Sequence, residues 1–362
     1  MDNNDYVMWL SRTLSQSNRK TVDLINFFGS PKEVFDAERN DYLGVRGMTE
    51  AVAEKLSDSK KNIEFWKKEI DNMGIEYVSF FDERYPILLN EINDAPCGLY
   101  VKGRLPGNDE RCVSIIGARR CSEYGRLTAY GFATKIASRG VWIISGMARG
   151  IDSISHKGAI SAGGKTVAVL GFGHNKCYPA ENRDLMNKIS ENGCVISEYP
   201  PDTEPEVYFF PQRNRIIAGM SEALIVVEAG KKSGTLITVD RALDYGRTVL
   251  AVPSNITSAS GEGTNDLIKQ GCPMITNAQD VFFELGMDDD EDKKEKQHET
   301  KMKCLSDDEN KILGLLSYEP LPFEKIVKNS GKDIQDVQYI LTLLEINGFA
   351  EKLPGNRFTK KI

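Results

Sequence analysis

Short apolar runs rich in β-branched residues recur through the middle of the chain and alternate with segments of helical length. Runs of this kind predict buried strands, and their alternation with helices predicts a parallel sheet covered on both faces. We therefore expect an α/β domain over residues 79–287. The predicted strands are Cys112–Ile116, Val141–Ser145, Thr166–Leu170, Val195–Ser197, Ala223–Val227 and Thr248–Val252.

Residues 1–78 show helical apolar spacing instead, as in Val7–Leu14 and Thr21–Phe28. A tight glycine turn at Leu43–Met48 leads into a further helical segment, Thr49–Leu56. Helix, glycine turn and helix are typical of a helix-hairpin-helix domain, although a short turn between two packed helices gives the same pattern.

A run of charged residues precedes the C-terminal segment. Residues 288–304 contain almost nothing apolar, which predicts a flexible charged linker. Residues 305–362 then carry three helical patterns and strand character around a Pro-Gly-Asn turn. Three helices followed by a terminal hairpin predict a winged-helix domain.

The composition is that of a globular protein, with 40% hydrophobic and 27% charged residues among 362. A net charge of −7 excludes a uniformly basic DNA coat but permits a local basic groove. Seven scattered cysteines without a CxxC pair argue against a disulfide framework or a zinc site, so we expect a reducing, cytoplasmic setting. The acidic N-terminus is unlike a signal peptide, and no apolar run is long enough to predict a membrane span.

The loops after the predicted strands carry glycines and basic side chains. In a Rossmann-like doubly wound sheet, ligands bind beyond the carboxyl ends of the strands, so we expect these loops to share one edge. Glycine turns and helix amino ends offer free amides to a phosphate, and arginine adds paired donors. The candidate binding residues are Gly117, Arg119, Arg120, Ser145, Gly146, Arg149, Lys176, Arg213, Asn214, Arg215, Lys231, Ser233, Gly234 and Thr235.

The charge distribution favours an extended ligand. Acidic and basic residues nearly balance over 112–287, yet the basic ones gather after strands. The segment Phe210–Ile216 is expected to be extended, which would aim Arg213 and Arg215 to the same side. A nearly neutral domain with a basic rim suits a long polyanion, whereas a mononucleotide needs fewer cations.

Blander interpretations of these loops remain open. Residues 117–125 are explained equally well as a plain strand-to-helix turn with two solvated arginines. Asp152 and His156 would share one helix face and could form a general base, although a structural hydrogen bond is favoured. The segment Gly171-Phe172-Gly173 lacks the third glycine of a dinucleotide site.

The middle segment also carries several motifs in a fixed order: Gly117-Ala-Arg119, Ser145-Gly-Met-Ala-Arg-Gly-Ile-Asp152, Tyr178-Pro179, Ser197-Glu198-Tyr-Pro200, Phe210-Pro-Gln-Arg-Asn-Arg-Ile216, Glu228 with Ser233-Gly-Thr235, and Ala251-Val-Pro253. Over about residues 110–275 this order resembles the DNA-processing protein family DprA, also called Smf. Two positions depart from the family pattern, because Ala118 stands where serine is frequent and Ser254 where glycine is common.

The resemblance implies a bacterial cytosolic protein that binds single-stranded DNA without sequence preference and protects it during natural transformation. It further implies help in loading a RecA-type recombinase onto strands coated by single-strand binding protein, and assembly as a homodimer. The flanking segments resemble a SAM-like helical domain and a winged-helix domain of that family. No cofactor and no metal are expected.

The main rival is an enzyme that binds or hydrolyses nucleotides. The core also resembles, more distantly, nucleoside-monophosphate phosphoribohydrolases, which carry a Gly-Gly-x-Gly-Thr loop and a nearby glutamate. Glu228 with Ser233-Gly-Thr235 is similar, but the paired glycines are missing. A transcriptional role through the winged helix is a third possibility, weakened by the eight basic and nine acidic residues of 305–362. The expectation is therefore a binding protein without catalytic residues.

The helical segment before the linker suggests a self-association surface. Phe282 and Phe283 are adjacent, so both rings cannot enter one narrow core stripe of a helix. We expect part of this face to pair with its copy in a dimer, while internal packing of both rings is nearly as well supported.

Overall fold

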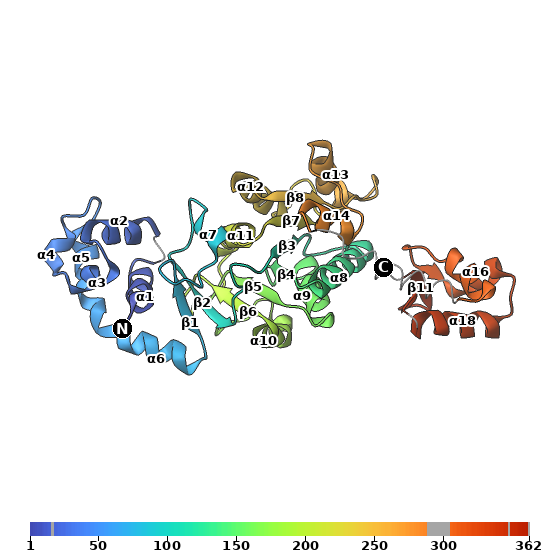
Figure 1. Cartoon of the computed structure of the whole chain (residues 1–362), viewed down its shortest axis with the longest axis horizontal. Coiled ribbons are helices and arrows are strands. Elements are labelled where there is room, and N and C mark those ends of the chain that lie inside the picture. Colours follow the sequence, from blue (N-terminus) through green and yellow to red (C-terminus); the bar gives the residue numbers. More distant parts are fainter. Residues whose placement is uncertain (16–17, 288–304, 347, 361–362) are drawn as a thin grey trace. The chain divides into compact units, whose positions relative to one another are not determined.

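The computed structural model describes residues 1–15, 18–287, 305–346 and 348–360 (Figure 1). It divides into two compact units, Met1–Leu285 and Gly286–Ile362. The predicted linker, 288–304, lies outside the described residues. The boundary predicted after residue 78 falls inside the first unit, and a division of that unit into two domains stays a proposal.

The six predicted strands form the parallel part of an eight-stranded sheet. They are β3 (Cys112–Ile116), β4 (Trp142–Ser145), β5 (Thr166–Leu170), β6 (Cys194–Ser197), β7 (Ala223–Val226) and β8 (Thr248–Ala251). Two strands that the pattern did not predict, β1 (Glu76–Ser79) and β2 (Gly98–Gly103), extend one edge antiparallel. All residues of β3 to β7 are buried, which explains their uninterrupted apolar character.

The strand order is β1-β2-β6-β5-β4-β3-β7-β8. From β3 the chain moves outward through β4 and β5 to β6, and then returns to place β7 and β8 on the other side of β3. This order confirms the predicted doubly wound sheet. Its topological switch point lies between β3 and β7, where the following loops diverge and leave a crevice.

Helices cover both faces of the sheet (Figure 1). The first face carries α8 (Glu123–Ser138), α9 (Ile151–Ser161) and α10 (Arg183–Asn192). The second face carries α11 (Phe209–Gly219) and α12 (Thr235–Asp244), which pack along each other. Two shorter helices, α13 (Glu262–Lys269) and α14 (Ala278–Glu284), complete the unit.

The prediction of an extended segment at 210–216 is wrong, because these residues belong to α11. Pro211 sits in the first turn of this helix, where its missing N–H has no intrahelical partner to lose. Residues two apart on a helix point to nearly opposite sides. Arg213 and Arg215 are therefore separated rather than aligned.

The N-terminal segment is helical, as predicted. Its helices are α1 (Asn3–Thr13), α2 (Asn18–Phe28), α3 (Pro31–Asp36), α4 (Arg39–Tyr42), α5 (Glu50–Ser59) and α6 (Ile63–Asn72), and the predicted glycine turn joins α4 to α5. Their apolar side chains share one buried cluster with Tyr77 of β1 and Tyr100 of β2. A cut after residue 78 would therefore open a common core.

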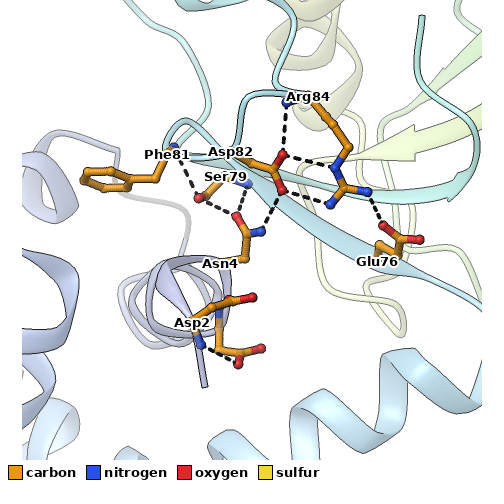
Figure 2. A network of polar contacts seen from close by, with 8 residues as sticks. Asp2, Asn4, Glu76, Ser79, Phe81, Asp82 and Arg84 are labelled. Carbon is orange, nitrogen blue, oxygen red and sulfur yellow. Dashed lines mark hydrogen bonds and ion pairs between the residues drawn. The ribbon is translucent and has the colours of Figure 1, made fainter. Parts of the chain in front are cut away.

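Polar contacts tie α1 to the edge of the sheet (Figure 2). The Asn4 side chain accepts hydrogen bonds from the Ser79 N–H at 2.9 Å and the Ser79 hydroxyl at 2.7 Å, and donates to Asp82 at 2.8 Å. Arg84 donates to Asp82 and to Glu76. These hydrogen bonds from Arg84 lower the pKa of Asp82 to about 2, so the network is charged at neutral pH.

The second unit has the predicted helices and hairpin. They are α16 (Asp307–Leu315), α17 (Phe323–Ser330), α18 (Ile334–Ile346), β10 (Ala350–Leu353) and β11 (Arg357–Lys360). A short strand that was not predicted, β9 (Leu321–Pro322), pairs with β11 and completes a three-stranded sheet. This arrangement is a winged helix.

The two adjacent phenylalanines of α14 have different environments. Phe282 is 2% exposed, and the Arg139 guanidinium lies 4.3 Å from its ring centroid. Internal packing therefore removes Phe282 from the expected dimer surface. Phe283 is 79% exposed, and its place in a dimer contact stays a prediction.

Among the described helices, none is both long and apolar enough to cross a bilayer. The six cysteines within the described ranges are free thiols. In the same ranges, no three His, Cys, Asp or Glu side chains gather in a way that could hold a metal ion.

Candidate nucleic-acid interface

A cleft of about 590 Å³ opens at the switch point of the sheet. The loops after β3, β4, β5 and β7 contribute to its walls together with the first turns of α11. The residues lining it include Gly117, Ala118, Arg119, Arg120, Ala148, Asp152, Tyr178, Val207, Phe210, Arg213, Asn214, Ser233, Gly234 and Thr235. The convergence of separate loops on one edge, expected from the topology, is confirmed.

The floor of the cleft is held by close backbone contacts. The Ala118 N–H donates to the Glu228 carbonyl at 2.8 Å, which joins the loop after β3 to the loop after β7. Gly150 has a φ of +74°, and a side chain there would place its Cβ 2.3 Å from the Ala118 carbonyl oxygen. Only glycine permits this approach. The loop that carries Arg119 and Arg120 is thereby fixed between its two neighbours.

Arg119 and Arg120 are the available cations of the cleft. Both are exposed, and within the described part of the chain neither forms an ion pair of 4.0 Å or less. The Arg119 guanidinium lies 5.5 Å from the ring centroid of Phe210. Stacking of this kind orients a guanidinium while its N–H groups stay free for a phosphate.

Arg213 is a buried clamp rather than a free cation. It is 3% exposed and donates to the carbonyl of Gly146 at 2.5 Å and to that of Val169. A Cβ at Gly146 would lie 2.6 Å from an Asp152 oxygen and 2.7 Å from the Arg213 nitrogens, so glycine leaves room for both side chains. Burial lowers the pKa of Arg213 to about 10, and Asp152 opposes that shift, so the group remains charged at neutral pH.

Arg215 does not line the cleft. It forms a buried ion pair in which one of its nitrogens, Nη2, lies 2.6 Å from each carboxylate oxygen of Glu198. The separation of Arg213 and Arg215 follows from the helical geometry of α11. The candidate role of Arg215 as a phosphate contact has no support in this position.

Apart from Arg215, the candidate residues fall into three groups. Eight line the cleft: Gly117, Arg119, Arg120, Arg213, Asn214, Ser233, Gly234 and Thr235. Ser145 and Gly146 lie beneath it, and the buried Ser145 hydroxyl donates to the Ile115 carbonyl at 2.6 Å. Arg149, Lys176 and Lys231 stand outside it in ion pairs with Glu181, Glu204 and Glu262. Exposed pairs of this kind contribute little, so these three could exchange a carboxylate for a phosphate.

The amino end of α12 forms another wall of the cleft. The Ser233 hydroxyl oxygen accepts the Thr235 N–H at 3.2 Å, and the N-cap Gly234 has no side chain to shield the following amides. The partial positive charge of a helix amino end therefore adds to that of Arg119 and Arg120.

The expected pairing of Asp152 with His156 is wrong, because each has another partner. Nδ1 of His156 donates to the Thr166 hydroxyl oxygen at 2.7 Å, and that hydroxyl donates to the Ile143 carbonyl. Burial lowers the pKa of His156 to about 3, so the ring is neutral. Asp152 accepts the Ala148 N–H at 3.4 Å and faces Arg213, and burial raises its pKa.

Glu228 is also held in place. It is 1% exposed, and its carboxylate accepts the Ser122 N–H at 2.9 Å and the Ser260 hydroxyl. The two groups that an enzyme could use, Asp152 and Glu228, are therefore occupied by contacts that shape the loops.

Two aromatic residues of the cleft received no role in the sequence prediction. Tyr178 and Phe210 line it with ring centroids 5.6 Å apart, and Tyr178 is 45% exposed. Tyr208 lies nearby in the chain and is 59% exposed. The sequence feature that could have identified these rings is the pairing of an aromatic residue with proline in two of the ordered motifs, Tyr178-Pro179 and Phe210-Pro211.

Comparison with known proteins identifies the family. The sequence profile of the family described as DNA recombination-mediator protein A matches residues 76–286, more than half of the chain. This chain belongs to the DprA (Smf) family. The profile of the DprA winged helix domain matches residues 297–356, in agreement with the fold of the second unit.

Relatives of the DprA family match over long segments. DNA processing protein DprA of Bacillus subtilis (strain 168) is 39% identical over 213 residues, which are 59% of this chain and 72% of that protein. Protein Smf of Escherichia coli (strain K12) is 33% identical over 314 residues, 85% of this chain and 84% of that protein.

Solved DprA structures share the fold. The X-ray structure of DprA from Streptococcus pneumoniae has a TM-score of 0.67 at 31% identity and covers 78% of this chain and 99% of its own. A structure of DNA processing protein A from Helicobacter pylori has a TM-score of 0.52 at 28% identity, and the match covers 58% of this chain and 95% of that chain. That work concerns the single-stranded DNA binding mode of the Helicobacter protein.

Proposed function

We propose that the cleft binds single-stranded DNA without sequence preference and that the protein acts in DNA processing as a recombination mediator. The observation that carries the proposal is Arg119, an exposed guanidinium stacked on Phe210 at the cleft. One side chain offers charge to a phosphate, and its neighbour offers a ring to a base.

Single strands suit this cleft better than a duplex. Aromatic stacking requires bases that are not already stacked in a double helix, and it tolerates every base because each has a π-face. Tyr178 and Phe210 provide such rings beside Arg119 and Arg120. Phosphate contacts carry no sequence information, so the whole arrangement favours general binding.

The partners expected from the family resemblance belong to the same proposal. We propose that the protein protects incoming DNA and loads a RecA-type recombinase onto strands coated by single-strand binding protein. We also propose that it assembles as a homodimer and is located in the cytoplasm. Support comes from the match to a recombination-mediator family and, for the dimer, from the exposed Phe283.

We further propose that the protein catalyses no reaction on the bound strand. Asp152 and Glu228 are committed to loop contacts, and His156 donates to Thr166. Bound oligonucleotide should therefore stay intact with Mg²⁺ or Mn²⁺. Metal-dependent cleavage that disappears in Asp152→Ala or Glu228→Ala would favour the enzyme alternative.

Fluorescence anisotropy of labelled oligonucleotides on the full chain tests the proposed binding. Oligo-dT should bind at least about tenfold more tightly than a duplex of equal length, and unstructured strands of other sequence should bind within a few-fold of oligo-dT. Equal affinity for duplex and single strand would contradict the proposal.

A further inference from the structure

Helix α18 occupies the position of the recognition helix in the second unit, which is the helix that enters the DNA groove in helix-turn-helix proteins. Its sequence, Ile334–Ile346, contains no lysine or arginine. Its exposed side chains are instead neutral or acidic: Ile334, Gln335, Asp336, Gln338, Tyr339, Thr342 and Glu345. A surface of this kind repels a phosphate backbone.

A groove of about 340 Å³ runs between the amino end of α16 and this face of α18. Three carboxylates border the groove against a single amine. Apolar surface is present as well, because Tyr339 is 65% exposed and Leu343 is half-buried. The groove is lined by Ser306, Asp308, Glu309, Lys332, Asp336, Tyr339, Ile340 and Leu343.

Some charged side chains of this acidic groove already have a partner, and one does not. The Lys332 amine lies 2.7 Å from an Asp308 oxygen, so the single cation is already paired. Glu309 accepts the Ser306 N–H and hydroxyl, each at 2.8 Å, in the capping box of α16. Asp336 makes no ion pair or side-chain hydrogen bond to the described residues. The groove therefore presents net negative charge and one unused carboxylate beside a tyrosine ring.

We propose that this acidic groove docks a basic amphipathic helix of a partner protein. An arginine of the partner would pair with Asp336 and stack on Tyr339, since guanidinium groups do both. An apolar side chain one turn away would lie against Leu343, as in helix-in-groove recognition. The choice of occupant rests on charge complementarity, which disfavours nucleic acid and acidic segments alike.

The positions of the basic residues in this unit support the assignment. Exposed basic residues lie on α16, at Lys311, on α17, at Lys325 and Lys328, and on the hairpin, at Lys352 and Arg357. None of these five residues lines the acidic groove. The described lining of the groove thus holds three carboxylates and one lysine that is already paired, which favours a cationic ligand.

Charge reversal in the full chain tests the proposal. The probe is a labelled helical peptide of about four turns with Arg and Leu at amphipathic spacing, compared with a peptide in which Glu replaces Arg. The wild-type chain should bind the Arg peptide and not the Glu peptide. Asp336→Lys should weaken binding at least about tenfold, and Tyr339→Ala by several-fold.

Gln338→Lys is the matched control, because Gln338 is exposed on the same helix but does not line the groove. It should change peptide affinity less than about twofold, which separates docking from general attraction of a cationic peptide to an acidic protein. Equal losses in Asp336→Lys and Gln338→Lys, or no preference for the Arg peptide, would overturn the proposal. Oligo-dT binding is measured on the same variants, so a loss of DNA binding is detected separately from a loss of peptide binding.

Discussion

Arg215 and Glu198 form a buried ion pair in which a single arginine nitrogen lies 2.6 Å from both carboxylate oxygens. Asn18 at the start of α2 donates to the same carboxylate at 3.1 Å and accepts the Cys97 N–H at 3.1 Å. This chain of contacts links the N-terminal helices to α11, which lines the cleft at the switch point of the sheet. Arg215 thus acts on the position of α11.

Arg215→Ala should therefore destabilise the protein. Removing one partner of a buried pair leaves an uncompensated charge, which typically costs about 3–5 kcal/mol. Urea unfolding should show this loss, whereas Arg119→Ala, at an exposed site, should change the free energy of unfolding by less than about 0.5 kcal/mol. A fully stable Arg215→Ala protein would contradict this structural role of the Arg215–Glu198 ion pair.

Arg119→Ala should weaken single-stranded DNA binding equally for all sequences. Each lost phosphate contact reduces the slope of log affinity against log salt by about 0.7 for single strands. Arg104→Ala is the control, because the exposed Arg104 side chain pairs with Glu110, far from the cleft. Its backbone N–H donates to the Gly193 carbonyl just before β6, at the edge of the sheet opposite the cleft. An unchanged slope in Arg119→Ala, measured by anisotropy at several salt concentrations, would argue against a phosphate contact at this residue.

The two phenylalanines of α14 should respond differently to substitution. Phe283→Glu should shift the protein from dimer to monomer in light scattering without loss of fold, because the ring is exposed. Phe282→Ala should instead lower the free energy of unfolding by about 3–5 kcal/mol, as expected for a buried aromatic. A folded Phe283→Glu variant that remains fully dimeric would exclude this surface from the dimer.

Two buried histidines should make stability depend on pH. Burial lowers the pKa of His156 to about 3 and that of His174 to about 4, whereas the unfolded value is about 6.5. Between these values the unfolded chain binds more protons, so stability is complete above pH 6.5 and falls as the pH decreases. The slope can reach about 1.4 kcal/mol per pH unit for each histidine.

Urea unfolding between pH 7 and 5 measures this slope before most carboxylates titrate. His156→Gln should remove about half of it, since one of the two titrating rings is lost. A flat profile in the wild-type protein would contradict burial of the neutral rings.

The sequence predicted the sheet well because its strands are buried on both faces and read as continuous apolar runs. Strands β1 and β2 escaped prediction, since they pair antiparallel at the edge and share the core of the N-terminal helices. Helix α11 was missed because the aromatic and proline residues at its start favour extended structure when read alone. The packing of α11 against α12 and β5, rather than the local conformational preference of its first residues, determines its conformation.

The topology of the sheet predicted that the cleft loops converge. It did not predict which of their charged side chains are exposed and which are buried. Arginines are rarely buried, so a sequence favours exposure for Arg213 and Arg215 alike. Their burial depends on partners distant in sequence, Asp152 and Glu198. In the same way, the rings of Tyr178 and Phe210 lie together in the cleft only because two separate segments bring them there.

Photo-cross-linking locates the bound strand most directly. Oligo-dT carrying 5-iododeoxyuridine reacts on irradiation with an aromatic ring stacked on the base, and peptide mapping of the full chain identifies the residue. The account predicts cross-links at Tyr178 or Phe210, reduced when Arg119 is replaced by Ala. Cross-links confined to the winged helix or to α1–α6, with none in the cleft, would contradict it.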